Sequence, residues 1–163
     1  MTQIQSMNLA GNDLTGTLPA SLGDLLELTE LDLGGNRLSG TVPHTFGKLS
    51  KLLRLSVSDN ALNGPIPVAL GRLRKLDHLE MHDNQFTGAI PDTIGRIGYL
   101  ESLRLYGNAL TGCVPRCIAS HASSCVLRAE TERRQAELET ELEREKERYD
   151  QLRLQVDELV IAS

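Results

Sequence analysis

The chain of 163 residues is poor in aromatic residues, which make up 3% of it, and it contains no tryptophan. It has no run approaching the roughly 18 apolar residues that a membrane span requires. Its first residues show neither a basic region nor an apolar core, so no signal peptide is evident. A net charge of −5 and the shortage of base-stacking aromatics argue against nucleic-acid binding. The 40% hydrophobic content excludes wholesale disorder.

Glycine and proline are missing from the last third of the chain. All 14 glycines lie at or before Gly112, and all 6 prolines lie at or before Pro115. Because these residues mark turns, the first part is expected to turn often and the last part not at all. Residues 1–127 carry 11 acidic and 10 basic side chains, a net charge of −1, whereas residues 128–163 carry 11 and 7, a net charge of −4. The sequence therefore predicts one ordinary domain followed by an acidic appendage.

The first part contains a repeat of 24 residues without slippage, present in five registers. An asparagine, a glycine, a proline and three apolar positions recur in each register. The repeated asparagines are Asn12, Asn36, Asn60, Asn84 and Asn108. The repeated glycines are Gly16, Gly40, Gly64, Gly88 and Gly112, and the repeated prolines are Pro19, Pro43, Pro67, Pro91 and Pro115.

Each unit has the features of a coil that packs against its neighbours. In the second unit, Leu31 and Leu33 share one face of a short strand, whereas Asp32 between them points away. The asparagine that follows is suited to bond backbone groups of neighbouring coils, which would otherwise be buried without partners. The unit continues as an extended return and closes with a short helical turn. Because one unit cannot bury its leucines alone, stacking of the units must supply the core.

The stretch from Leu28 to Leu49 matches nearly every position of the pattern L-x-x-L-x-L-x-x-N-x-L-[ST]-G-x-[IV]-P-x-x-[LF]-G-x-L, and the sequence therefore resembles the plant-type leucine-rich repeat. The resemblance implies an α/β fold, a solenoid with a parallel sheet on its concave face and short 3-10 or helical turns. It also implies protein recognition, with a spacer role inside an assembly as the alternative. We assign residues 1–118 to the solenoid, 119–127 to a C-terminal cap or linker, and 128–163 to a charged helix.

Three features of the secreted relatives are missing from the sequence: a signal peptide, a paired-cysteine N-terminal cap and Asn-x-Ser/Thr glycosylation sites. The first strand is expected to begin almost at Met1, which leaves the leading edge of the core uncovered. Either a partner covers that edge or the chain is part of something longer. On the assumption that Met1 is the true start, the missing secretion features favour a cytoplasmic location.

The side chains that point out of the predicted concave strands form a mixed polar surface. Arg54, Arg104 and Tyr106 are the best candidate anchors because arginine and tyrosine are favoured at binding hot spots. A solvated sheet face without a partner is the alternative. The predicted protein-binding residues are Glu30, Asp32, Arg54, His78, Glu80, His82, Arg104 and Tyr106.

Two patterns contain metal-ligand residue types, but their spacing does not converge on one ion. His78, Glu80 and His82 alternate along one strand face, where they diverge along about 13 Å. The second pattern is Cys113, Cys117, His121 and Cys125. On a helix these four form a long stripe, so we expect reduced structural thiols, with a disulfide second and zinc last. Neither a metal nor another cofactor is therefore expected.

Residues 128–163 predict one continuous helix about 54 Å long, rich in strong helix formers and in oppositely charged pairs at helical spacing. Apolar residues at alternating steps of four and three give a coiled-coil seam, which Glu145 interrupts. The helix-docking residues are Leu138, Leu142, Tyr149, Leu152, Val156 and Leu159. We expect a docking or dimerising helix, because this apolar face would be costly in water. An isolated charged helix, held by its own ion pairs, is the alternative.

The sequence contains no catalytic constellation, so we expect a non-enzymatic interaction or scaffold subunit with protein partners and neither nucleic-acid nor membrane binding. Its sheet would bind a protein, and its helix would dock into a multi-subunit assembly, for which a cytoskeletal or ciliary complex is suggested. Self-association through the helix is a further expectation. A second hypothesis is the ligand-recognition region of a secreted receptor or inhibitor. A remote third is a metal-dependent enzyme around His78, Glu80 and His82.

Overall fold

The structure is a computed structural model, and it describes residues 4–112 together with Arg144. The chain divides into two units, residues 1–127 and 128–163. The predicted cap, the cysteine cluster and the docking seam all lie outside the described residues. These are Cys113, Cys117, His121 and Cys125, and Leu138, Leu142, Tyr149, Leu152, Val156 and Leu159. Arg144 is helical, but the long helix as a whole stays a prediction. Among the described residues, no helix is both long and apolar enough to cross a membrane.

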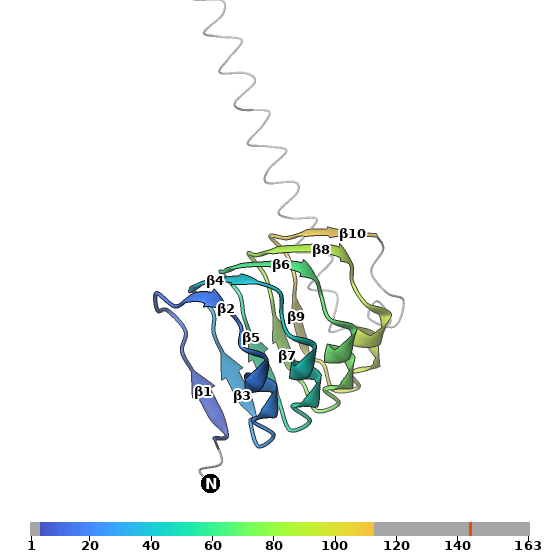
Figure 1. Cartoon of the computed structure of the whole chain (residues 1–163). Coiled ribbons are helices and arrows are strands. Elements are labelled where there is room, and N and C mark those ends of the chain that lie inside the picture. Colours follow the sequence, from blue (N-terminus) through green and yellow to red (C-terminus); the bar gives the residue numbers. More distant parts are fainter. Residues whose placement is uncertain (1–3, 113–143, 145–163) are drawn as a thin grey trace, which may run out of the picture. The chain divides into compact units, whose positions relative to one another are not determined.

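Five short strands form a parallel sheet, which we call the first sheet (Figure 1). In order across the sheet they are β1 (Ser6–Asn8), β3 (Glu30–Asp32), β5 (Arg54–Ser56), β7 (His78–Glu80) and β9 (Ser102–Arg104). The pairing register equals the 24-residue repeat, so that Arg54 stands between Glu30 and His78. Equivalent side chains of successive coils therefore lie in columns across the sheet. This arrangement confirms the parallel sheet expected from the repeat.

The return segments form a second parallel sheet, whereas the sequence predicted only an extended return. Its strands, in spatial order, are β10 (Ala109–Thr111), β8 (Gln85–Ala89), β6 (Ala61–Pro65), β4 (Arg37–Gly40) and β2 (Thr15–Thr17). Thr15 pairs with Arg37 and Gly16 with Leu38, a register of 22 residues that is two short of the repeat. The stacked returns bring their backbone N–H and C=O groups within reach of one another, and hydrogen bonding satisfies these groups.

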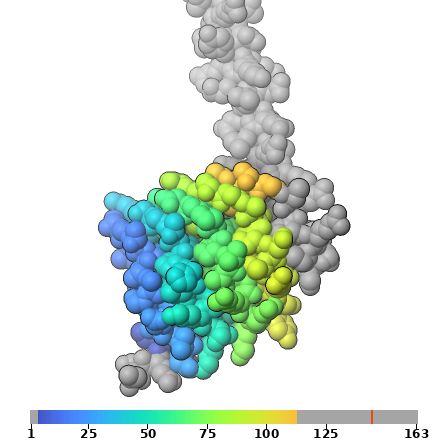
Figure 2. Space-filling model, turned by 45° about the vertical axis from the view of Figure 1, so that its right-hand side comes forward, coloured from blue at the N-terminus to red at the C-terminus, as the bar shows by residue number. Residues whose placement is uncertain are grey.

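Short 3-10 helices close the coils, as expected from the repeat. They are η1 (Ala20–Asp24), η2 (His44–Lys48), η3 (Val68–Arg72) and η4 (Asp92–Arg96). The repeat proline precedes each of them; Pro43, for example, has φ −65° before η2. Neighbouring turns pack closely, because a Cβ placed on Gly47 would lie 2.5 Å from the carbonyl oxygen of Ala69. In the space-filling view, successive coils pack side by side in sequence order (Figure 2).

The core between the two sheets consists of apolar columns that run through successive coils. One fully buried column contains Leu28, Leu52 and Leu76. Phe46 and Phe86 are also fully buried and occupy positions that are leucine or isoleucine in other coils. In the first described coil the same column is more open, since Ile4 is 40% exposed. Each interior coil therefore depends on both neighbours for its burial.

The repeated asparagines tie neighbouring coils together, as the sequence predicted. The Asn84 side-chain amide donates to the carbonyls of Val57, Met81 and His82, and its Oδ1 accepts the Leu62 N–H at 3.0 Å. The equivalent side chains in three other coils make corresponding bonds. Asn84 is only 9% exposed, so its amide satisfies backbone groups that lie away from water.

Candidate protein-binding face

The structure places all eight predicted binding residues on or directly after the strands of the first sheet. Six of them lie on strands β3, β5, β7 and β9, and the other two follow β7 and β9 in the turns. We call the exposed side of this sheet the candidate face; its predicted residues are Glu30, Asp32, Arg54, His78, Glu80, His82, Arg104 and Tyr106. The 24-residue register aligns them into columns, so that side chains from four coils contribute to one surface.

Within the candidate face, several charged groups are already satisfied by neighbours. Arg104 Nη1 lies 3.3 Å from Glu80 Oε1, on the adjacent strand. His78 Nδ1 lies 2.6 Å from a carboxylate oxygen of Asp77. The backbone N–H of Arg54 donates to the Thr29 carbonyl, but across the described residues its exposed side chain makes neither a hydrogen bond nor an ion pair. Its guanidinium therefore keeps its five donors for water or a ligand.

A small hollow surrounds Arg54 in the middle of the candidate face. It has a volume of about 160 Å³, and its polar lining residues are Glu30, Asp32, Arg54, Ser56, His78 and Glu80. Pockets for small-molecule ligands usually occupy about 300–1,000 Å³, so this hollow suits a single side chain better than a whole metabolite. Acidic side chains flank the arginine, and the hollow thus offers both signs of charge within three adjacent strands.

The structure does not bring His78, Glu80 and His82 to one centre. His78 is bonded to Asp77 and Glu80 is bonded to Arg104, while His82 stacks on Tyr106 with ring centroids 4.6 Å apart. Each of the three side chains therefore contacts a different partner.

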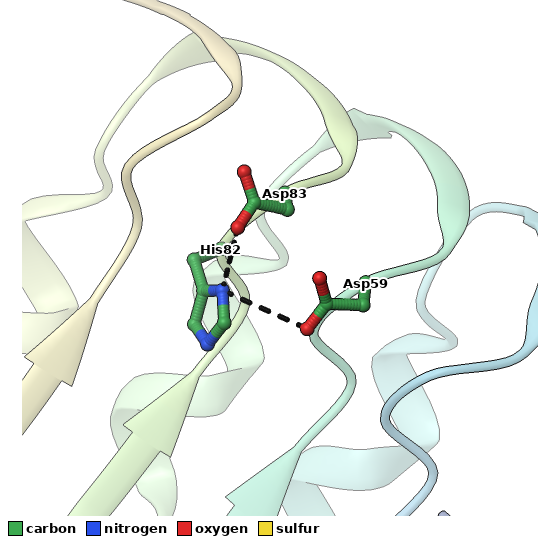
Figure 3. A group of neighbouring side chains, drawn as sticks. All are labelled: Asp59, His82 and Asp83. Carbon is green, nitrogen blue, oxygen red and sulfur yellow. Dashed lines mark hydrogen bonds and ion pairs between the residues drawn. The ribbon is translucent and has the colours of Figure 1, made fainter. Parts of the chain in front are cut away.

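His82 instead joins two carboxylates that the sequence analysis did not single out, Asp59 and Asp83 (Figure 3). Its Nδ1 lies 3.0 Å from Asp83 Oδ2 and 3.9 Å from Asp59 Oδ2. The repeat itself held a signal for these aspartates, because the equivalent turn position of the other three coils is glycine. These glycines are Gly11, Gly35 and Gly107.

Comparison with protein families matches two models described as leucine rich repeats, over residues 3–25 and 26–86. No curated protein matches the sequence. Among solved structures, a chain of the BIR3–SERK2 complex from Arabidopsis thaliana is similar, with 34% identity and a TM-score of 0.70. That similarity covers 76% of this chain and 67% of the other.

Two larger chains are similar in the same way. The Arabidopsis receptor kinase HAESA, in complex with the peptide hormone IDA and the co-receptor SERK1, shows 36% identity and a TM-score of 0.70, over 74% of this chain and 20% of that chain. PEPR1 in complex with AtPEP1 shows 44% identity and a TM-score of 0.69, over 71% of this chain and 16% of that chain. The present chain thus spans only a fraction of these two chains.

The stacked coils and the polar sheet face define a solenoid of the kind that acts in protein–protein interaction. The chain belongs to the leucine-rich-repeat family, in its plant type. Proteins of this kind are typically non-enzymatic receptor or interaction domains.

Proposed function

We propose that the chain is a ligand-recognition solenoid, which binds an extended peptide or a protein segment on the candidate face. Of the two leading hypotheses from the sequence, ligand recognition has the better support, since the similar structures include the receptor kinase HAESA in complex with the peptide hormone IDA and the co-receptor SERK1. A scaffold role through residues 128–163, self-association and a cytoplasmic location remain predictions from the sequence alone.

The observation that carries this proposal is the guanidinium of Arg54 in the central hollow, which has no partner within the part of the chain that the structure describes. Arg104, two strands away on β9, is paired with Glu80, so Arg54 is the arginine of the two that holds its donors ready for a ligand. A guanidinium fork binds a carboxylate through two parallel hydrogen bonds, and arginine is enriched among the residues that dominate binding energy. We therefore propose that Arg54 binds an acidic side chain of the ligand.

The carboxylates beside Arg54 determine the rest of the expected ligand. Glu30 lies directly across from Arg54 on the adjacent strand, and Asp32 lies on the same strand as Glu30. Neighbouring strands are about 4.8 Å apart, and side chains two residues apart in an extended peptide are about 6.7 Å apart. Long, flexible side chains compensate for the difference between these two spacings. The ligand that fits best carries a basic residue two positions from an acidic one, in extended conformation.

Selection of displayed random peptides on the immobilised full-length chain tests the proposal. We expect the enriched peptides to share a basic and an acidic residue at this spacing. Arg54→Ala should weaken their binding by about tenfold or more, as expected for a central arginine anchor. Arg37→Ala is the matched control, because Arg37 is an exposed strand arginine of the second sheet; it should change affinity less than twofold.

A charge exchange sharpens the same test. The Arg54→Glu variant should reject the selected peptides but accept versions in which the acidic residue is replaced by lysine. Equal binding to the wild type and Arg54→Ala, or no enrichment in the selection, would overturn the assignment of Arg54 and with it the proposed function.

A further inference from the structure

The chain holds a cluster of metal-ligand side chains, formed by His82 of the candidate face together with Asp59 and Asp83 (Figure 3). The three residues come from two neighbouring coils, since Asp59 follows β5 while His82 and Asp83 follow β7. We propose that His82 Nδ1 and one carboxylate oxygen each of Asp59 and Asp83 form a binding site for a divalent zinc-type cation. This site is separate from the peptide recognition proposed around Arg54.

The distances within the cluster fit one small cation. In tetrahedral zinc sites with bonds of about 2.1 Å to nitrogen and oxygen, two ligand atoms are about 3.4 Å apart. The separations from His82 Nδ1 to Asp83 Oδ2 and to Asp59 Oδ2, 3.0 and 3.9 Å, lie on either side of this value. All three ligand atoms lie within 4.8 Å of one another. An ion fits between them once the two carboxylates move toward each other, by at most about 1.4 Å, to the tetrahedral separation.

The imidazole at the centre of the cluster is held in place before any ion arrives. Its ring stacks on Tyr106 at an angle of 12° between the two planes, and the His82 side chain is only 12% exposed. In Figure 3 its Nδ1 faces the two carboxylates, and both aspartates lie in the bends that follow strands β5 and β7. A ligand that is fixed in its orientation loses less entropy when it binds a metal, and such orientation strengthens metal sites.

Among the described coils, aspartate at the turn position and histidine beside it occur together only at Asp59, His82 and Asp83. Asp59 and Asp83 have φ values of 51° and 52°, and they are the described non-glycine residues with positive φ. Glycine adopts this conformation without a steric cost, and aspartate tolerates it only moderately. The chain therefore places carboxylates side by side at two turn positions that glycine would occupy more easily, and it places histidine next to them.

The types of coordinating atom in the cluster favour some metal ions over others. One imidazole nitrogen and two carboxylate oxygens suit zinc and similar transition metals, and the remaining coordination positions face solvent and are open to water. Calcium prefers six to eight oxygen ligands and gains little from the imidazole. Zinc is accordingly the probe that distinguishes a metal site from a pair of ordinary exposed carboxylates.

Zinc titration of the full-length chain, followed by calorimetry, tests the site. The cysteines are blocked by alkylation beforehand, so that thiolates do not contribute to zinc binding. We expect one equivalent of zinc to be bound by the wild type and to be lost in both His82→Gln and Asp59→Asn. His78→Gln is the matched control, because His78 also contacts a carboxylate, that of Asp77, but lies outside the cluster; it should retain the equivalent.

Far-UV circular dichroism and the urea midpoint show whether each variant is folded, and the isosteric Asp59→Asn keeps the test decisive if His82→Gln unfolds. Equal zinc binding by the wild type and both cluster variants would overturn the proposal, as would loss of binding in His78→Gln. Calcium binding that Asp59→Asn abolishes and His82→Gln leaves intact would also overturn it, since it would show a carboxylate site without the imidazole. Failure of the zinc test leaves peptide binding at Arg54 unaffected.

Discussion

Truncation of the Asn84 side chain should destabilise the chain more than truncation of the exposed repeat asparagine Asn12. Asn84→Ala removes three donated bonds to carbonyls and the bond from Leu62 N–H to Oδ1. The carbonyl of Val57 also accepts from Asn60, and that of Met81 from Asn108, so these two oxygens keep a partner.

The Leu62 N–H is the group that truncation leaves unsatisfied, in a residue that is fully buried. A buried donor without a partner costs about 1–3 kcal/mol, and each lost bond with a remaining alternative costs less. We therefore expect the free energy of unfolding to fall by about 2–4 kcal/mol. Urea unfolding of the full-length chain, followed by far-UV circular dichroism, measures this change.

Asn12→Ala is the matched control for Asn84→Ala. The Asn12 amide donates to the carbonyls of Leu9 and Ala10 at an exposed site. Water replaces these bonds easily, so the loss should be about 1 kcal/mol or less. If the two variants lowered stability equally, the reasoning would be wrong, because burial of the amide would then have no role in its contribution.

Three further predictions concern packing and surface charge, each measured by the urea midpoint. Gly47→Ala should cost about 1–3 kcal/mol because its Cβ would overlap Ala69, whereas Gly98→Ala, with nothing within 4 Å, should be neutral to about 0.5 kcal/mol; similar midpoints would contradict this. Phe86→Ala should cost about 3–5 kcal/mol, since the ring is fully buried, and a smaller loss would mean that the coils collapse into the cavity. Arg37→Ala should cost less than about 1 kcal/mol, because its ion pair is exposed; a larger loss would show a structural role for the pair.

The fold was largely predictable from the sequence because the repeat leaves few alternatives. Asn36 and its equivalents recur every 24 residues, and a constant step forces each coil to present the same side chains to the next. The first sheet, the 3-10 turns and the asparagine bonds follow from that step. The second sheet was missed because its strands pair two residues out of register with the repeat, as between Thr15 and Arg37.

The sequence predicted which side chains lie on the candidate face, but it did not predict which of them pair with one another. Sequence reasoning placed Arg54 and Arg104 on the same face, but it did not predict that Glu80 pairs with only one of them. It considered His82 only beside His78 and Glu80, which it expected to diverge, since side-chain direction after a strand depends on the turn that follows. That turn brings Asp59 and Asp83 to His82.

By itself, the sequence determined the family, the stacked coils and the columns that each residue occupies, because periodic burial of leucine admits one arrangement. The tertiary structure decided which charges are paired and which remain available. Among residues 4–112 the Arg54 side chain has no partner, and His82 lies near the carboxylates of Asp59 and Asp83 from adjacent coils. Side chains from neighbouring coils come into contact only when the backbone register and the conformation of the turns are both fixed. The 24-residue period specifies the register, but it does not specify the conformation of the turns.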